Sequence, residues 1–80
     1  MRDFRRSFEP DSSFVTWIGY DEEREILALD LRRGSRIEYG DVPLATYLVL
    51  RREDEDPNGS VGAYYNSYIK TTFVAPEEGD

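Results

Sequence analysis

Trp17-Ile18-Gly19-Tyr20-Asp21, Leu27-Ala28-Leu29-Asp30-Leu31 and Arg36-Ile37-Glu38-Tyr39 are the three stretches that decide the fold of this 80-residue chain. The first belongs to a run rich in aromatic and β-branched residues, which suit a half-buried pleated strand. The other two alternate apolar and polar residues with a period of two, as a strand with one face in the core does. Short polar turns separate the three stretches. This order predicts a three-stranded antiparallel meander.

Two amphipathic segments follow the predicted strands. Asp41-Val42-Pro43 is a helix-start signal, because proline fits the first helical turn, where its missing N–H is not needed. Leu44, Tyr47 and Leu48 then fall on one helical face. We expect this first helix to end near Arg52.

A second helix is predicted after the polar loop that ends at Gly59. Ser60 is suited to cap it, and apolar residues then recur at three- and four-residue steps over residues 61–69. Residues 71–75 are predicted to form a last short strand. The fold class is therefore α+β, a three-stranded antiparallel β-meander packed against one or two short helices. The predicted core residues are Leu27, Leu29, Leu31, Ile37, Tyr39, Leu44, Leu48, Val61, Tyr65 and Ile69.

The chain is long enough for one small domain. Residues 1–11 show no sustained period and contain Pro10, so we interpret them as a flexible N-terminal arm. Residues 12–75 form the single predicted domain, and residues 76–80 read as a solvated acidic tail.

The composition argues against most catalytic chemistry. The chain has no cysteine and no histidine, which removes thiolate nucleophiles, imidazole bases and the usual zinc ligand sets. We therefore expect no enzyme activity, no cofactor, no metal and no evident small-molecule substrate. No apolar run approaches the ~20 residues of a membrane-spanning helix, and the N-terminus lacks the apolar core of a signal peptide. We expect a cytoplasmic protein without membrane contact.

The net charge is −7, and residues 12–74 alone hold eleven acidic and seven basic side chains. Because RNA binding draws on phosphate neutralisation, an acidic domain has to concentrate its basic residues locally to bind RNA. Two arginine clusters are candidates for gripping phosphate, although arginines in turns and at helix ends often only balance nearby charges. They are Arg32, Arg33 and Arg36 at one turn, and Arg51 and Arg52 at a helix end.

The loop Asp54-Glu55-Asp56-Pro57-Asn58-Gly59 matches the first half of a calcium-binding loop. The twelfth position of that motif, which would supply a bidentate glutamate, is Tyr65. The loop also has the composition of an ordinary exposed turn, which is the reading we favour.

Several short motifs occur in the order and spacing of a known family. The chain resembles the KTSC domain, a small module named after the C-terminus of some lysyl-tRNA synthetases, over about residues 12–73. The third strand of that family carries a Tyr-any-Tyr pattern, and Ile37 occupies its first position here, so a function needing both rings does not carry over. The motifs that carry the resemblance are Ile18-Gly19-Tyr20-Asp21, Arg33-Gly34-Ser35, Tyr39-Gly40-Asp41-Val42-Pro43, Gly62-Ala63-Tyr64-Tyr65-Asn66 and Ile69-Lys70.

The resemblance suggests a non-catalytic RNA-binding module, with tRNA as a possible ligand. The residues we expect to contact RNA are Arg36, Tyr39, Asn66 and Lys70. Asn66 and Lys70 lie four apart and share one face of a helix, although Asn66 is equally suited to capping backbone groups. The alternative is a protein–protein interaction module that uses an exposed sheet edge or the acidic surface.

Overall fold

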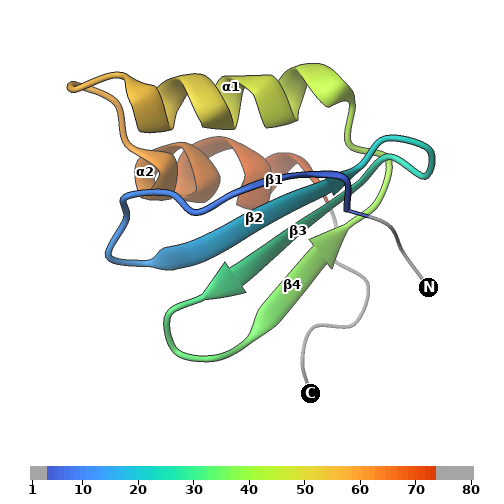
Figure 1. Ribbon diagram of the computed structural model, residues 1–80, viewed down its shortest axis with the longest axis horizontal. Coiled ribbons are helices and arrows are strands. Elements are labelled where there is room, and N and C mark those ends of the chain that lie inside the picture. Colours follow the sequence, from blue (N-terminus) through green and yellow to red (C-terminus); the bar gives the residue numbers. More distant parts are fainter. Residues whose placement is uncertain (1–3, 74–80) are drawn as a thin grey trace.

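The computed structural model describes residues 4–73 and has an antiparallel sheet followed by helical segments (Figure 1). The strands are β1 (Arg6–Phe8), β2 (Val15–Asp21), β3 (Ile26–Leu31) and β4 (Arg36–Tyr39). The helical segments are α1 (Leu44–Glu55), α2 (Val61–Tyr64), the π-helix η1 (Tyr65–Ile69) and α3 (Lys70–Thr72). The α+β class is confirmed.

The sheet has four strands in the order β1-β2-β3-β4, rather than the three that the sequence predicted. The additional strand, β1, lies in the segment expected to be a flexible arm and pairs with β2, with Phe8 opposite Ile18. Three residues are too few to show a strand period in the sequence. The Phe8 ring also packs edge-on against the ring of Tyr47 in α1, with centroids 5.8 Å apart, so a contact distant in sequence supports β1.

A β-bulge in β2 decides which side chains face the helices. Val15 pairs with Leu31, but the next pair is Trp17 with Asp30, so Thr16 is an extra residue. Val15 and Ile18 are therefore both buried, whereas Trp17 lies on the other face of the sheet. We call this second side the open face, because the helical segments in Figure 1 lie on the opposite side of the sheet.

The core lies between the sheet and the helical layer. The predicted position of Leu48 is wrong: its side chain is 46% exposed, and Leu44 is only partly buried. Tyr47 and Leu50 are fully buried instead. Successive helical residues are about 100° apart, so a helix that points Tyr47 at the sheet turns Leu48 away from it.

The two predicted helix starts are confirmed. Pro43 precedes the first residue of α1, and Ser60 Oγ accepts a hydrogen bond from the Ala63 N–H at 3.1 Å. The first helix continues to Glu55, three residues beyond the expected end. The strand expected at residues 71–75 is wrong for its described part, because Thr71 and Thr72 are helical. Residues 74–75 and the expected acidic tail lie outside the described residues.

The last helix contains one π-helical turn, in which the Lys70 N–H donates to the carbonyl of Tyr65. In a π-helical turn, as in an α-helix, side chains four apart lie on the same side of the helix. Tyr65 and Ile69 are both buried, and the rings of Tyr64 and Tyr68 stack with centroids 5.2 Å apart. Asn66 and Lys70 have the same spacing.

Candidate functional site

The structure separates the four residues that the sequence suggested for binding. Arg36 lies on the open face of the sheet, and Tyr39 is buried in the core. Asn66 and Lys70 are exposed and line one pocket. The four residues therefore do not form one surface, and only the helical pair stays together.

Arg36 contacts two neighbouring side chains on the open face. Its guanidinium donates two hydrogen bonds to the Asp30 carboxylate, at 2.6 and 3.1 Å. The guanidinium carbon also lies 4.7 Å from the ring centroid of Trp17, a cation–π contact. The hydrogen bond to Asp30 raises the pKa of Arg36, despite partial burial. Its charge is therefore balanced before any ligand arrives.

Tyr39 has a packing role. It is 4% exposed, and its hydroxyl shares a 2.8 Å hydrogen bond with the hydroxyl of Tyr65. The pair joins β4 to η1 through the core and satisfies two buried polar groups. The ring of Tyr39 is not presented to solvent.

The pocket beside Asn66 and Lys70 has a volume of about 410 Å³, and we call it the Lys70 pocket. Ligand-binding clefts usually measure about 300–1,000 Å³. Four chain segments meet there: the approach to β2, the end of β3 with the following turn, β4, and η1 with the start of α3. The lining residues are Phe14, Leu31, Arg33, Ile37, Tyr65, Asn66 and Lys70.

The Lys70 pocket combines two cations with apolar and amide groups. Its described lining residues include Arg33 and Lys70 but no carboxylate. Among residues 4–73, no carboxylate forms an ion pair with either of these two side chains. Both charges therefore remain available to an anionic ligand.

Sequence reasoning identified Arg33 only as one member of a turn cluster, and the structure divides that cluster. Arg32 donates hydrogen bonds to the carbonyls of Ser13 at 3.0 Å and Ser12 at 2.9 Å. It therefore fixes the chain just before β2. Arg33, the next residue, lines the pocket instead.

Phe14 was not singled out from the sequence. It is 36% exposed, and its ring centroid lies 5.7 Å from that of Tyr65. One aromatic residue at the start of a strand gives no signal of its own. Only the fold brings it next to a helix some fifty residues later in the chain.

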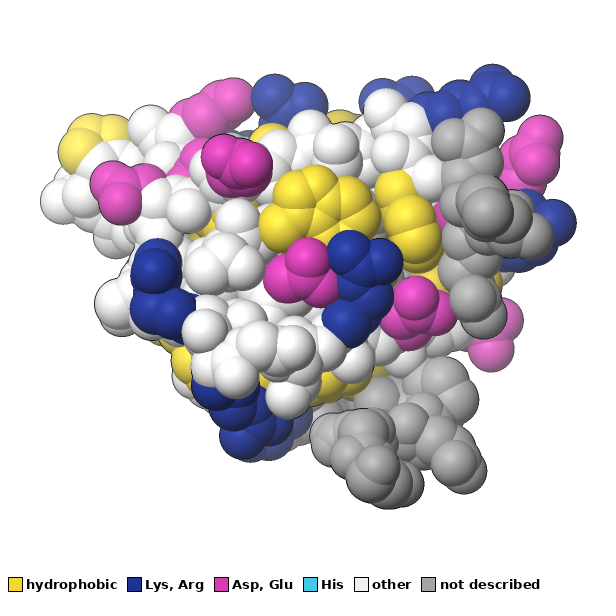
Figure 2. Space-filling model, turned by 60° about the horizontal axis from the view of Figure 1, so that its bottom comes forward, with side chains coloured by type: hydrophobic (Ala, Val, Ile, Leu, Met, Phe, Trp, Pro, Cys, Tyr) yellow, Lys and Arg dark blue, Asp and Glu magenta, His cyan; other side chains and the backbone are white. Residues whose placement is uncertain are grey.

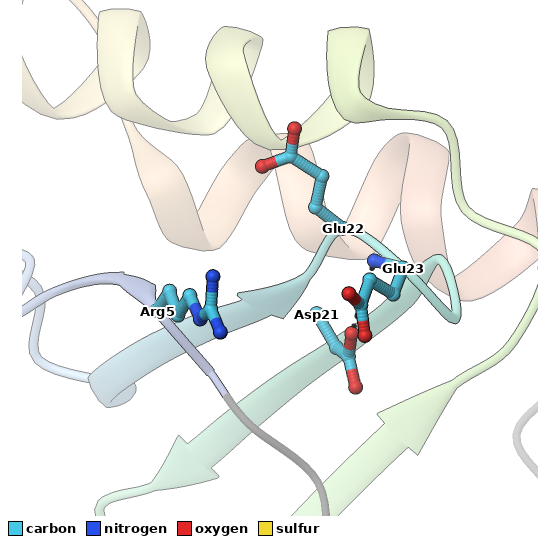
Figure 3. A pocket seen from close by; sticks show the side chains of 4 residues that line it. All are labelled: Arg5, Asp21, Glu22 and Glu23. Carbon is cyan, nitrogen blue, oxygen red and sulfur yellow. Dashed lines mark hydrogen bonds between the residues drawn. The ribbon is translucent and has the colours of Figure 1, made fainter.

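A second pocket, of about 280 Å³, lies where β2 ends (Figure 3). Arg5 and the acidic residues Asp21, Glu22 and Glu23 line it. Burial acts to raise the pKa of Asp21, but hydrogen bonds from Arg24 and from the Glu23 N–H outweigh it and lower that pKa. The Asp21 carboxylate thus holds the β2–β3 turn, accepting from the backbone N–H groups of Glu23 and Arg24 at 3.1 and 3.2 Å.

The loop that resembles half a calcium site uses its carboxylates on the backbone. Asp54 Oδ1 accepts from the Asp11 N–H at 2.8 Å, and Asp56 Oδ1 accepts from the Asn58 N–H at 2.9 Å. Within the described part of the chain, no three acidic side chains are grouped so that they could hold a metal ion. None of the helices in residues 4–73 is long and apolar enough to span a membrane.

Comparison with known proteins decides the family. The sequence profile of the KTSC domain matches residues 11–73. The chain belongs to the KTSC domain family. A search of curated proteins gives no significant match.

A solved KTSC structure shares this fold. The crystal structure of a KTSC domain protein from Yersinia pestis superposes with a TM-score of 0.76 at 23% sequence identity. The match covers 92% of this chain and 97% of the other. At this level of identity the likeness concerns the fold, so the ligand has to be argued from the residues of this KTSC domain.

Proposed function

We propose that this KTSC domain is a non-catalytic module that binds RNA at the Lys70 pocket. The observation that carries the proposal is that Arg33 and Lys70 line one pocket whose described lining residues include no carboxylate. Phosphate groups are bound by such cations, and an acidic domain needs them to be gathered in one place.

The charged side chains are unevenly distributed over the surface. Figure 2 shows basic side chains at its lower left that stand apart from acidic ones, whereas acidic and basic side chains adjoin at its centre. Arg36, which pairs with Asp30, is an example of the second kind. The net charge of −7 thus does not describe every part of the surface.

The chemistry of the pocket supports binding without catalysis. Of the described lining residues, only Tyr65 has a side-chain hydroxyl, and that hydroxyl shares a hydrogen bond with the hydroxyl of Tyr39. The other titratable side chains among the described lining residues are Arg33 and Lys70, both of which are cations suited to binding phosphate.

An amide-resolved NMR titration with mixed tRNA tests the proposal. At low salt we expect shifts at Arg33, Asn66 and Lys70 that fade at high salt. The Lys70→Gln variant should bind more weakly, whereas Arg52→Gln, which removes the same charge from an exposed position outside the pocket, should bind more like the native domain. A spectrum unchanged by tRNA at low salt would refute RNA binding.

A second candidate function is binding of a protein strand at the free edge of β4. Among the described strands, β4 pairs only with β3, so its other edge is free. An exposed edge can accept a strand from a partner through main-chain hydrogen bonds. Such binding would shift the amides of residues 36–39 and depend little on salt, which distinguishes it from RNA binding.

A further inference from the structure

We propose that the Lys70 pocket holds a single unpaired nucleotide, with its base against Phe14 and its phosphate between Arg33 and Lys70. This inference rests on the proposed RNA-binding function and names the part of an RNA that the site accepts.

Hydrogen bonds on both sides hold the backbone of Phe14 in place. Its N–H donates to Ser12 Oγ at 3.0 Å, and its carbonyl accepts from the Arg32 N–H at 2.9 Å. The Arg32 side chain holds the carbonyls of Ser12 and Ser13 from the other side. A partly exposed ring on a backbone fixed in this way loses little freedom on binding, and aromatic faces accept any base by stacking.

The last helix places a polar amide and a cation on the same side, facing the pocket. The π-helical turn brings Asn66 and Lys70, four residues apart, to the same side, where both line the pocket. The Asn66 amide carries a donor and an acceptor, which suits the edge of a base. The Lys70 ammonium suits a phosphate oxygen, and Arg33 approaches from the β3–β4 turn.

The volume of the pocket limits what it can hold. A pocket of about 410 Å³ has room for one nucleotide but not for a helical duplex. Bases within a duplex are stacked on both faces, so a ring such as Phe14 reaches only a base that is splayed out. The pocket therefore selects loops, bulges or chain ends.

The test is a set of NMR titrations of the full chain with adenosine 5′-monophosphate, adenosine, ribose 5-phosphate and a short single-stranded RNA. We expect the monophosphate to shift Phe14, Arg33, Asn66 and Lys70, and to bind more tightly than adenosine or ribose 5-phosphate. Phe14→Leu should weaken monophosphate binding by about 5- to 150-fold, the range for removing one stacking ring. Phe14→Trp, which keeps a stacking ring, should bind and serves as the second variant if the leucine variant does not fold.

Three outcomes would overturn the inference. Equal binding of the monophosphate and ribose 5-phosphate, with no effect of Phe14→Leu, would leave only a phosphate site. Single-stranded RNA that binds elsewhere, while the monophosphate leaves the pocket unmoved, would remove the nucleotide site but keep RNA binding by the domain. A chain that binds none of the probes would refute the proposed function as well.

Discussion

The open face of the sheet and the Lys70 pocket contain similar residues but offer different chemistry. Each has an aromatic ring and an arginine, yet Arg36 on the open face is held by Asp30 and lies over Trp17. In the pocket, the described residues that line it beside Arg33 and Lys70 include no carboxylate, and Phe14 stays partly exposed. The two surfaces therefore differ in charge pairing, not in the presence of a cation and a ring.

The two faces of β3 should give the largest contrast in stability. Leu29 is fully buried on the helical face, whereas its neighbour Asp30 lies on the open face. Leu29→Asp places an unpaired charge in the core and should unfold the domain, because that cost exceeds the few kcal/mol available to a small domain. The control Leu48→Asp, at a 46% exposed position, should keep a cooperative thermal melt. A folded Leu29→Asp variant would contradict the described packing.

A single methyl group added to the open face at Gly19 should destabilise the domain. A Cβ at Gly19 would lie 2.2 Å from Cη2 of Trp17, so Gly19→Ala forces the indole to move. We expect a loss of about 1–3 kcal/mol in unfolding free energy, as for an overpacked site. Gly40→Ala is the matched control, since nothing lies within 4 Å of its Cβ position. Chemical denaturation measures both, and equal stability of the two variants would show that Trp17 does not lie over Gly19.

Acid should weaken the β2–β3 turn on the other side of the molecule from the proposed phosphate contacts. The folded pKa of Asp21 is below its ordinary value of 3.8, so its contribution is complete above that pH and is lost as pH falls through the folded pKa. The free energy of unfolding should therefore fall below about pH 4. Asp21→Asn should make that fall shallower, measured by denaturation between about pH 2 and 6. An unchanged pH profile would mean that Asp21 does not supply the effect.

Removing the ion-pair partner of Arg36 should leave an unpaired cation on the open face, as in the Lys70 pocket, and slightly strengthen RNA binding. Asp30→Asn removes the bidentate partner, and the side chains of this pair are 46% and 34% exposed. An exposed pair contributes at most about 1 kcal/mol, so we expect RNA binding to strengthen by no more than about fivefold. The measurement is RNA affinity at low salt. Weaker binding would show that Asp30 does more than neutralise Arg36.

The sequence predicted those parts of the fold that depend on local patterns. Alternation in β3 and β4 and the helix starts at Pro43 and Ser60 are all present. β1 and the bulge at Thr16 were missed, because each depends on pairing between distant residues. Leu48 was misplaced because Leu44, Tyr47 and Leu48 are all apolar and close together on the helix. Which of them faces the sheet is decided only when the helix packs.

The candidate site was predictable only in part. The spacing of Asn66 and Lys70 indicated a shared helical face, and both residues line the pocket. The involvement of Phe14 could not be foreseen, because it depends on how β2 lies against η1. The engagement of Arg36 by Asp30 depends on strand register, which places two residues six apart side by side on neighbouring strands.

The most direct test of RNA binding at the Lys70 pocket is the salt dependence of RNA affinity for the native chain and Lys70→Gln. Each phosphate neutralised contributes about 0.7 to the slope of log affinity against log salt for single strands. If Lys70 contacts a phosphate, the slope of the variant should be shallower by about that amount. If the native chain and Lys70→Gln have the same slope, and Arg36→Gln has a shallower one, the RNA lies on the open face and the account is contradicted.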